Sequence, residues 1–163
     1  MTTPKYRADE VEIMVARHFN PRINLIVPNV SWGLGLRHEC DMLILRPSGY
    51  AVEIEIKVDV YDLRKDKDKR KWIWDANKII KQTYFAVPKE LESEIENIPA
   101  GCGFITVECG HEYYTQQTVD VVKPAKVNRF AERLDEKKIL KLHRLAAMRI
   151  WGLKEKLIKG RKC

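Results

Sequence analysis

Two apolar runs that alternate with period two, joined by a short turn, constrain the fold of this chain more than any other feature. The runs span residues 39–45 and 51–59. Such alternation is typical of β-strands, because successive side chains point to opposite faces of a sheet. It places Cys40 on the same face as Met42 and Ile44. The segment between the runs contains proline, serine and glycine, so an antiparallel hairpin is predicted.

The register of this hairpin decides which charged side chains meet. We expect Leu45 to pair with Ala51, and counting back along both runs then places Asp41 opposite Glu55. Opposed β-carbons are about 4.5–5.5 Å apart, so the two carboxylates repel unless a cation lies between them. Mg²⁺ suits such a pair, because it accepts one or two carboxylates and fills its other positions with water and substrate oxygens. Lys57 would orient or activate a water, or offset charge on a phosphate.

The pattern of Asp41 followed by Glu55-x-Lys57 resembles the PD-(D/E)xK nuclease superfamily. That group includes restriction enzymes, archaeal Holliday-junction resolvases and various repair and phage nucleases. The resemblance covers roughly residues 8–125. Cys40 stands where the family name would place a proline, at a position that varies. The resemblance implies an α/β fold with a mixed central sheet flanked by helices and a restriction-endonuclease-like core.

The same resemblance implies a function and a cofactor. The chain would be a metal-dependent nuclease that hydrolyses phosphodiester bonds of DNA, with Mg²⁺ or Mn²⁺ held by Asp41, Glu55 and the carbonyl of Ile56. Lys57 would be catalytic beside the metal. A nucleic-acid-binding module with little or no catalysis is the alternative, because a fold does not fix a function. A structural protein whose basic helix docks an acidic partner is a third interpretation.

An N-terminal helix is predicted over residues 8–19 from an apolar stripe that begins at Val11. Glu10 and Glu12 flank this stripe. Their order, Glu-x-Glu-aliphatic, resembles the helix of the resolvases, where the first glutamate is functional, which implies that Glu10 joins the catalytic and metal-binding residues. Acids near a helix start also suit the helix dipole, so both glutamates fit an ordinary solvated role.

A polar sheet face turned to water is the plainer interpretation of Asp41, Glu55 and Lys57. Such faces usually mix threonine and serine with charged residues, and four ionisable residues out of four on one face, at positions 53, 55, 57 and 59, favour a site instead. For Glu39 and Glu53 three roles stay open: support behind the metal ligands, salt-bridge partners of Lys57, or exposed charges.

A basic segment follows the second run directly. Residues 62–71 are predicted to form a helix that Asp62 caps or starts. Its basic residues would contact the phosphates of nucleic acid without reading sequence. A solvated helix with internal ion pairs is the alternative. The candidate nucleic-acid-binding residues are Arg64, Lys65, Lys67, Lys69, Arg70 and Lys71.

The net charge of +7 is concentrated at the C-terminal end. Residues 129–163 carry twelve basic and four acidic residues, whereas the rest carries 18 and 19. Localised positive charge is typical of proteins that bind polyphosphates. We therefore divide the chain into a core domain, 1–127, and a basic amphipathic helical extension, 128–163. Its helix, predicted over 128–159, would pack on the core, pair with a second subunit in a homodimer, or lie along nucleic acid.

The remaining features exclude some classes of protein. No stretch of 18 apolar residues and no apolar signal core occurs, so no membrane span is predicted and a cytoplasmic location is expected. The four cysteines do not have the paired spacing of a zinc motif. His38 adjoins the acidic strand and would contact substrate or be an ordinary loop residue. Further strands are predicted over 23–27, 82–87 and 103–108 and within 112–123, with a helix after Pro88.

Overall fold

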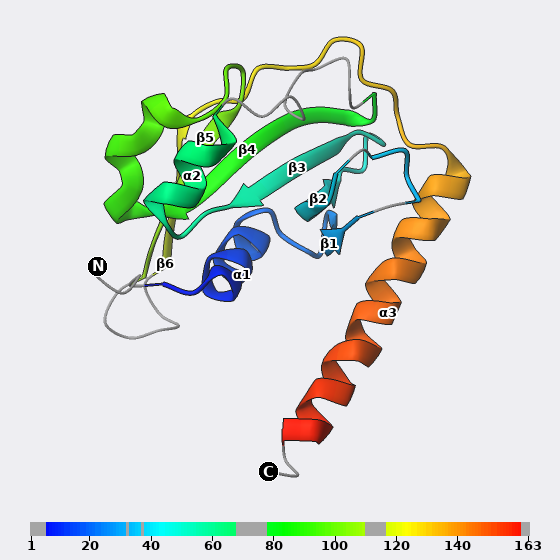
Figure 1. Ribbon diagram of the computed structural model, residues 1–163. Coiled ribbons are helices and arrows are strands. Elements are labelled where there is room, and N and C mark those ends of the chain that lie inside the picture. The colour runs from blue at the N-terminus through cyan, green and yellow to red at the C-terminus, as the bar shows by residue number, and fades with distance from the viewer. Residues whose placement is uncertain (1–5, 32, 37, 68–77, 110–116, 161–163) are drawn as a thin grey trace.

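A computed structural model describes residues 6–31, 33–36, 38–67, 78–109 and 117–160 (Figure 1). Six strands form one mixed sheet in the order β1-β2-β3-β4-β5-β6. The strands are β1 (Leu25–Val30), β2 (Cys40–Leu45), β3 (Ala51–Ile56), β4 (Ile80–Pro88), β5 (Gly103–Cys109) and β6 (Gln117–Lys123). The helices are α1 (Ala8–His18), α2 (Val60–Asp66), the 3₁₀ helix η3 (Lys89–Asn97) and α3 (Glu136–Gly160). The predicted α/β class, with a mixed sheet flanked by helices, is confirmed.

The predicted hairpin and its register are also confirmed. Strands β2 and β3 pair antiparallel, with Leu45 opposite Ala51 and Met42 opposite Ile54. Strands β3, β4 and β5 run parallel to one another, with α2 between β3 and β4 in the chain and η3 between β4 and β5. Parallel neighbours need such crossover connections, because a tight turn cannot return the chain to the same end of the sheet. Because α2 follows β3 directly in the chain, the C-terminal end of β3 lies beside the start of α2.

Helices cover both faces of the sheet. On one face, α1 packs Val11 and Met14 against a group that includes Ile44 and Ile54. On the other face, α3 packs against the side of the sheet that holds β1, with Leu142 fully buried. Helices α2 and η3 cover the β4 and β5 part of that second face. In the described residues, no helix is long and apolar enough to cross a membrane.

The alternation of side chains breaks at Cys40, which corrects one expectation. Met42 packs on the α1 face, but Cys40 packs with the α3-side group that contains Leu43. The neighbouring strand is irregular at the same level, because Asn29, between the partners of Met42 and Cys40, has a left-handed φ of 52°. The cysteine is therefore buried on the face that carries Glu53.

Two helix starts differ from the predictions. Helix α3 begins at Glu136 rather than near 128, where the Asp135 carboxylate accepts the backbone N–H of Lys138 at 2.8 Å. The segment before it instead hydrogen-bonds to the core, as the Asn128 N–H to the Lys81 carbonyl shows. Helix α2 is capped by Asp59 and not by Asp62, since the Asp59 carboxylate accepts the N–H groups of residues 61 and 62.

Candidate active site

The Asp41 carboxylate lies at the end of the β2–β3 pair. One step beyond the last backbone pair, its Oδ2 accepts the N–H of Ile56 at 2.7 Å. The N–H and C=O groups of one strand residue point to the same side, so the Ile56 carbonyl also faces the β2 side of β3. Asp41 therefore contacts Ile56, which is the residue between Glu55 and Lys57. Both Asp41 and Ile56 are predicted metal ligands.

Glu55, Lys57 and Asp66 form a buried group of charges on the α2 side. The Lys57 ammonium lies 2.9 Å from Glu55 Oε1 and 3.1 Å from Asp66 Oδ2. The exposed fractions of the three side chains are 5% for Glu55, 16% for Lys57 and 0% for Asp66. Buried charges persist in this way only when they are paired. The predicted partners Glu55 and Lys57 are in direct contact, and α2 adds a second carboxylate.

These contacts set the protonation state of Lys57. Burial by itself lowers the pKa of the ammonium, but hydrogen bonds and charge attraction from Glu55 and Asp66 outweigh it and raise the pKa above its ordinary value. Lys57 is therefore a cation at neutral pH. It can stabilise negative charge or orient a carboxylate, but it is not a general base at that pH.

The two glutamates of α1 have different surroundings. Glu10 accepts the backbone N–H of Arg7 at 2.8 Å and so serves the start of the helix. Glu12 is about half-buried, and its pKa is raised by burial and then by the charges of Asp41 and Asp9. The structure thus places Glu12 within electrostatic reach of Asp41. Glu10 remains a prediction from the resemblance, and its observed contact is a capping one.

A second group of ligand-type side chains lies on the face that carries Glu53. His38 Nε2 hydrogen-bonds to Glu53 Oε1 and lies 4.0 Å from Cys40 Sγ. Thr83 Oγ1 on β4 donates to the other Glu53 oxygen at 3.2 Å. Burial, followed by the carboxylates of Glu53, Glu55 and Asp41, raises the pKa of the Cys40 thiol well above its ordinary value. The chain therefore concentrates negative charge around Cys40.

The donor atoms of the predicted metal ligands suit Mg²⁺ or Mn²⁺. Asp41, Glu55 and the Ile56 carbonyl offer oxygen only, which these hard cations prefer. A carboxylate accepts up to about four hydrogen bonds or metal contacts, so the bonds from the Ile56 N–H to Asp41 and from Lys57 to Glu55 are compatible with metal binding. The residues present therefore fit the implied metal.

The described basic residues of α2 and of its C-cap, Lys67, are engaged in ion pairs and hydrogen bonds. Arg64 donates two bonds of 2.8 Å to Glu94 on η3. Lys65 lies 3.4 Å from Asp62, and Lys67 donates at 3.4 Å to a side chain of η3. This arrangement supports the solvated-helix interpretation for these three. The candidates Lys69, Arg70 and Lys71 lie outside the described residues.

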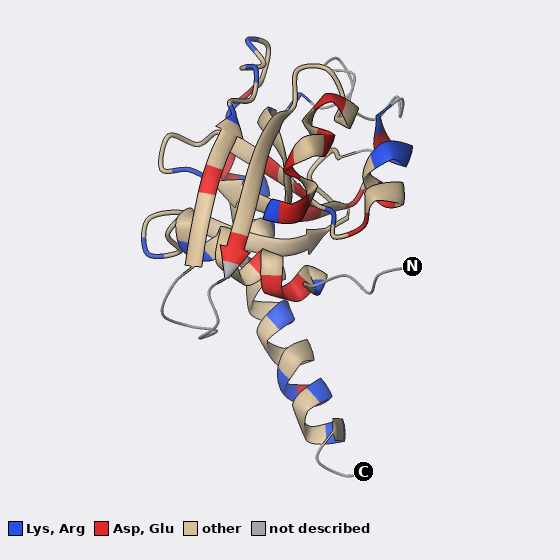
Figure 2. Cartoon of the chain, turned by 90° about the vertical axis from the view of Figure 1, so that its left-hand side faces the viewer, with Lys and Arg blue, Asp and Glu red and all other residues tan. Residues whose placement is uncertain are grey.

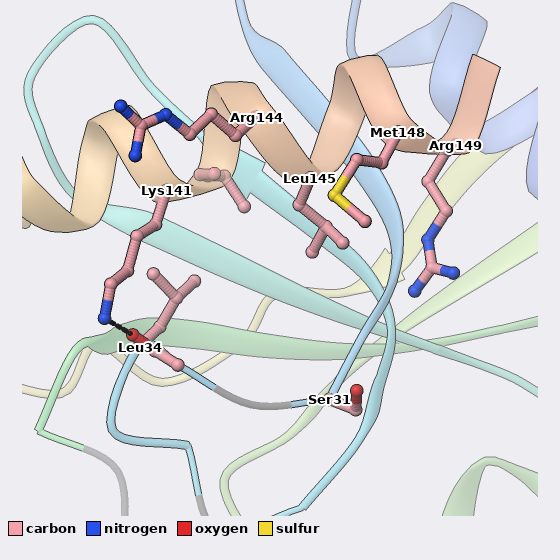
Figure 3. A pocket seen from close by; sticks show the side chains of 9 residues that line it. Ser31, Leu34, Lys141, Arg144, Leu145, Met148 and Arg149 are labelled. Carbon is pink, nitrogen blue, oxygen red and sulfur yellow. Dashed lines mark hydrogen bonds between the residues drawn. The ribbon is translucent and has the colours of Figure 1, made fainter. Parts of the chain in front are cut away.

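Basic residues recur along α3, whereas acidic residues gather mainly on the sheet and its nearby helices (Figure 2). A cavity of about 490 Å³ lies between α3 and three residues that follow β1, Ser31, Gly33 and Leu34 (Figure 3). Its lining combines apolar residues with Lys141, Arg144 and Arg149. Lys141 donates to the Gly33 carbonyl at 3.3 Å, and Arg149 donates to the Asn29 carbonyl. Two of the three cations therefore fasten α3 to the body.

Sequence reasoning missed Asp66 and the contacts of His38. Asp66 follows the buried Leu63 by three residues, so both lie on the inner face of α2, and this spacing was the available signal. His38 offered no such signal, because its contact with Glu53 depends on the path of the loop before β2.

Comparisons with known proteins bear on the fold alone. No protein-family model matches the chain, and a search of curated proteins gives no match either. The chain is similar in structure to a protein of unknown function from Silicibacter pomeroyi, with a TM-score of 0.59 and 19% identity. The match covers 98% of this chain and 94% of the other. It therefore extends across the sheet and α3.

Proposed function

We propose that this chain is a Mg²⁺- or Mn²⁺-dependent nuclease that cleaves DNA, with its active site at the C-terminal end of β3. One observation carries the proposal: the Asp41 carboxylate binds the backbone N–H of Ile56, directly between Glu55 and Lys57. This contact brings Asp41 to the strand that carries Glu55 and Lys57, which supports the proposal. A cytoplasmic location and a homodimer remain predictions.

Each residue has a physical task in this proposal. Asp41, Glu55 and the Ile56 carbonyl would hold the metal, which when bound lowers the pKa of water and polarises the phosphodiester. The Lys57 ammonium orients Glu55 through their 2.9 Å contact and offsets negative charge on the phosphate. Asp66 holds the same ammonium from α2 and so fixes its position.

Cleavage of labelled duplex, single-stranded and branched DNA tests the proposal. We expect products with Mg²⁺ or Mn²⁺ and none after chelation. Asp41→Asn should lower the rate at least about 100-fold, because it removes charge at the metal while keeping size and an oxygen acceptor for the Ile56 N–H. Asp120→Asn, an exposed acid on β6, is the matched control and should cleave at the wild-type rate. Equal rates for Asp41→Asn and wild type would refute the proposal.

A DNA-binding module without catalysis is favoured by one observation. Lys57 is held between two buried carboxylates, which is also how a purely structural ion pair is built. Such a protein would bind DNA with an affinity that falls steeply with salt, and no metal or substrate panel would yield products. Binding without cleavage by the wild type would select this alternative.

A further inference from the structure

Three side chains of different chemistry converge on the α3-side face of the sheet. His38 precedes β2, Cys40 opens it, and Glu53 lies within β3. One nitrogen, one sulfur and one oxygen from these residues all lie within 4.8 Å of one another. Cys40 and Glu53 are fully buried, while the His38 side chain is 9% exposed. The cluster therefore borders solvent at its histidine.

The geometry of this cluster is convergent and does not form a relay. A catalytic relay needs one ring nitrogen of the histidine for the nucleophile and the other for the carboxylate. Here the same atom, His38 Nε2, faces both the Cys40 thiol and the Glu53 carboxylate. Three ligand-type atoms that lie within 4.8 Å of one another are instead close enough to bind one metal ion.

The donor set selects the kind of metal. Thiolate, imidazole and carboxylate together suit Zn²⁺, which takes sulfur, nitrogen and oxygen ligands in tetrahedral geometry. Mg²⁺ requires oxygen ligands and does not fit a site with sulfur. Thr83 donates to the second oxygen of Glu53, as residues behind a metal ligand commonly do to orient it.

We propose that His38, Cys40 and Glu53 form a zinc site with a fourth position for water. It shares no ligand with the proposed Mg²⁺ site and does not depend on the proposed nuclease activity. Glu53 and Glu55 are two residues apart on one strand, which separates their α-carbons by about 6.6 Å. The zinc site would fasten the loop before β2 to the sheet and thereby fix the start of the strand that carries Asp41.

Cobalt(II) titration of the metal-free, reduced full-length chain tests this site directly. Cobalt(II) takes the same ligands as Zn²⁺, and a bound thiolate gives a charge-transfer band in the near ultraviolet. We expect this band in wild type, its loss on adding zinc, and its persistence in excess Mg²⁺. Cys40→Ser should abolish it. Cys102→Ser, at another buried cysteine outside the cluster, is the matched control and should keep it.

A second variant and a second readout keep the test decisive if Cys40→Ser does not fold. His38→Gln alters a loop residue and should weaken cobalt binding at least about tenfold, with circular dichroism confirming the fold. Zinc at a hundredfold excess over its Kd should raise the Tm of wild type and Cys102→Ser by about 5–10 °C. It should not raise the Tm of His38→Gln to the same extent.

The outcomes separate this site from the proposed nuclease centre. Asp41→Asn should lose DNA cleavage and keep the cobalt band. A folded wild type without the band, or a band that survives Cys40→Ser unchanged, would overturn the zinc site and leave the nuclease proposal untouched.

Discussion

The inner and outer sides of α2 carry ion pairs in opposite environments. On the inner side, Asp66 is fully buried and contacts Lys57 at 3.1 Å. On the outer side, Arg64 is 56% exposed and donates two bonds of 2.8 Å to Glu94. The Arg64–Glu94 pair has the better geometry, but water reaches its guanidinium and, at 14% exposure, part of Glu94, whereas the Asp66 carboxylate is cut off from water. Burial, more than bond length, therefore decides which pair the fold depends on.

The largest effect is expected at Lys57. Lys57→Met should lower the free energy of unfolding by about 3–5 kcal/mol, because it leaves the buried carboxylates of Glu55 and Asp66 without their cation. Urea denaturation at neutral pH measures this. Lys57→Arg keeps the charge and should cost clearly less. A loss below about 1 kcal/mol for Lys57→Met would contradict the importance of the buried pair.

The pH dependence of stability sharpens the same comparison. The pKa of Lys57 is raised in the folded chain, so its contribution is complete below the ordinary lysine value of about 10.4. That contribution is lost as the pH rises through the raised value. The difference in unfolding free energy between wild type and Lys57→Met should therefore narrow above about pH 10.4. A constant difference across the alkaline range would contradict this.

A smaller effect of opposite sign is expected at Glu12. Burial, followed by the charges of Asp41 and Asp9, raises the pKa of Glu12 in the folded chain. The favourable contribution of Glu12 to stability is therefore complete below its unfolded-state pKa of about 4.3. That contribution is lost as the pH rises through the folded-state pKa. In metal-free buffer at pH 7, Glu12→Gln should stabilise the chain by up to about 1 kcal/mol. At pH 3 the gain should vanish.

Glu10→Gln is the matched control on the same helix. Glu10 accepts the Arg7 N–H and has a capping role, so its replacement should not stabilise the chain at pH 7. Urea midpoints for both variants at the two pH values give the comparison. Destabilisation by Glu12→Gln at pH 7 would show that Glu12 has a favourable partner instead.

The smallest effect is expected at Arg64. Arg64→Ala removes both bonds to Glu94, yet this partly exposed carboxylate keeps the hydrogen bond that the Asn97 side chain donates to it at 2.7 Å. The urea midpoint should match that of wild type within error. A fall as large as that of Lys57→Met would erase the distinction between the two sides of α2.

Local pattern was enough to predict much of the fold. Alternation and turn chemistry predicted the β2–β3 hairpin with Leu45 opposite Ala51, and the apolar stripe predicted α1. Periodicity failed at Cys40, because it assumes a regular strand and the backbone at Asn29 is left-handed. It also failed before Glu136, where bonds from residues 126–134 to the core replace helical ones.

The candidate site was only partly predictable for a similar reason. Glu55 and Lys57 are two residues apart on one strand, so sequence spacing placed them on one face. Asp66 was hidden among basic residues, and its role depends on how α2 packs against the sheet. The contact of His38 with Glu53 depends on the path of the loop before β2, and the periodicity of a sequence does not predict that path.

The edge strand β1 holds Pro28 and the left-handed Asn29 side by side. Proline lacks the N–H that an added strand would need, and the kink beside it prevents a straight backbone ladder. A β-strand of another molecule therefore cannot easily extend the sheet from this edge. Protection against edge-to-edge aggregation is built into β1 itself, and of the two edges in the described sheet, the one at β6 needs other safeguards.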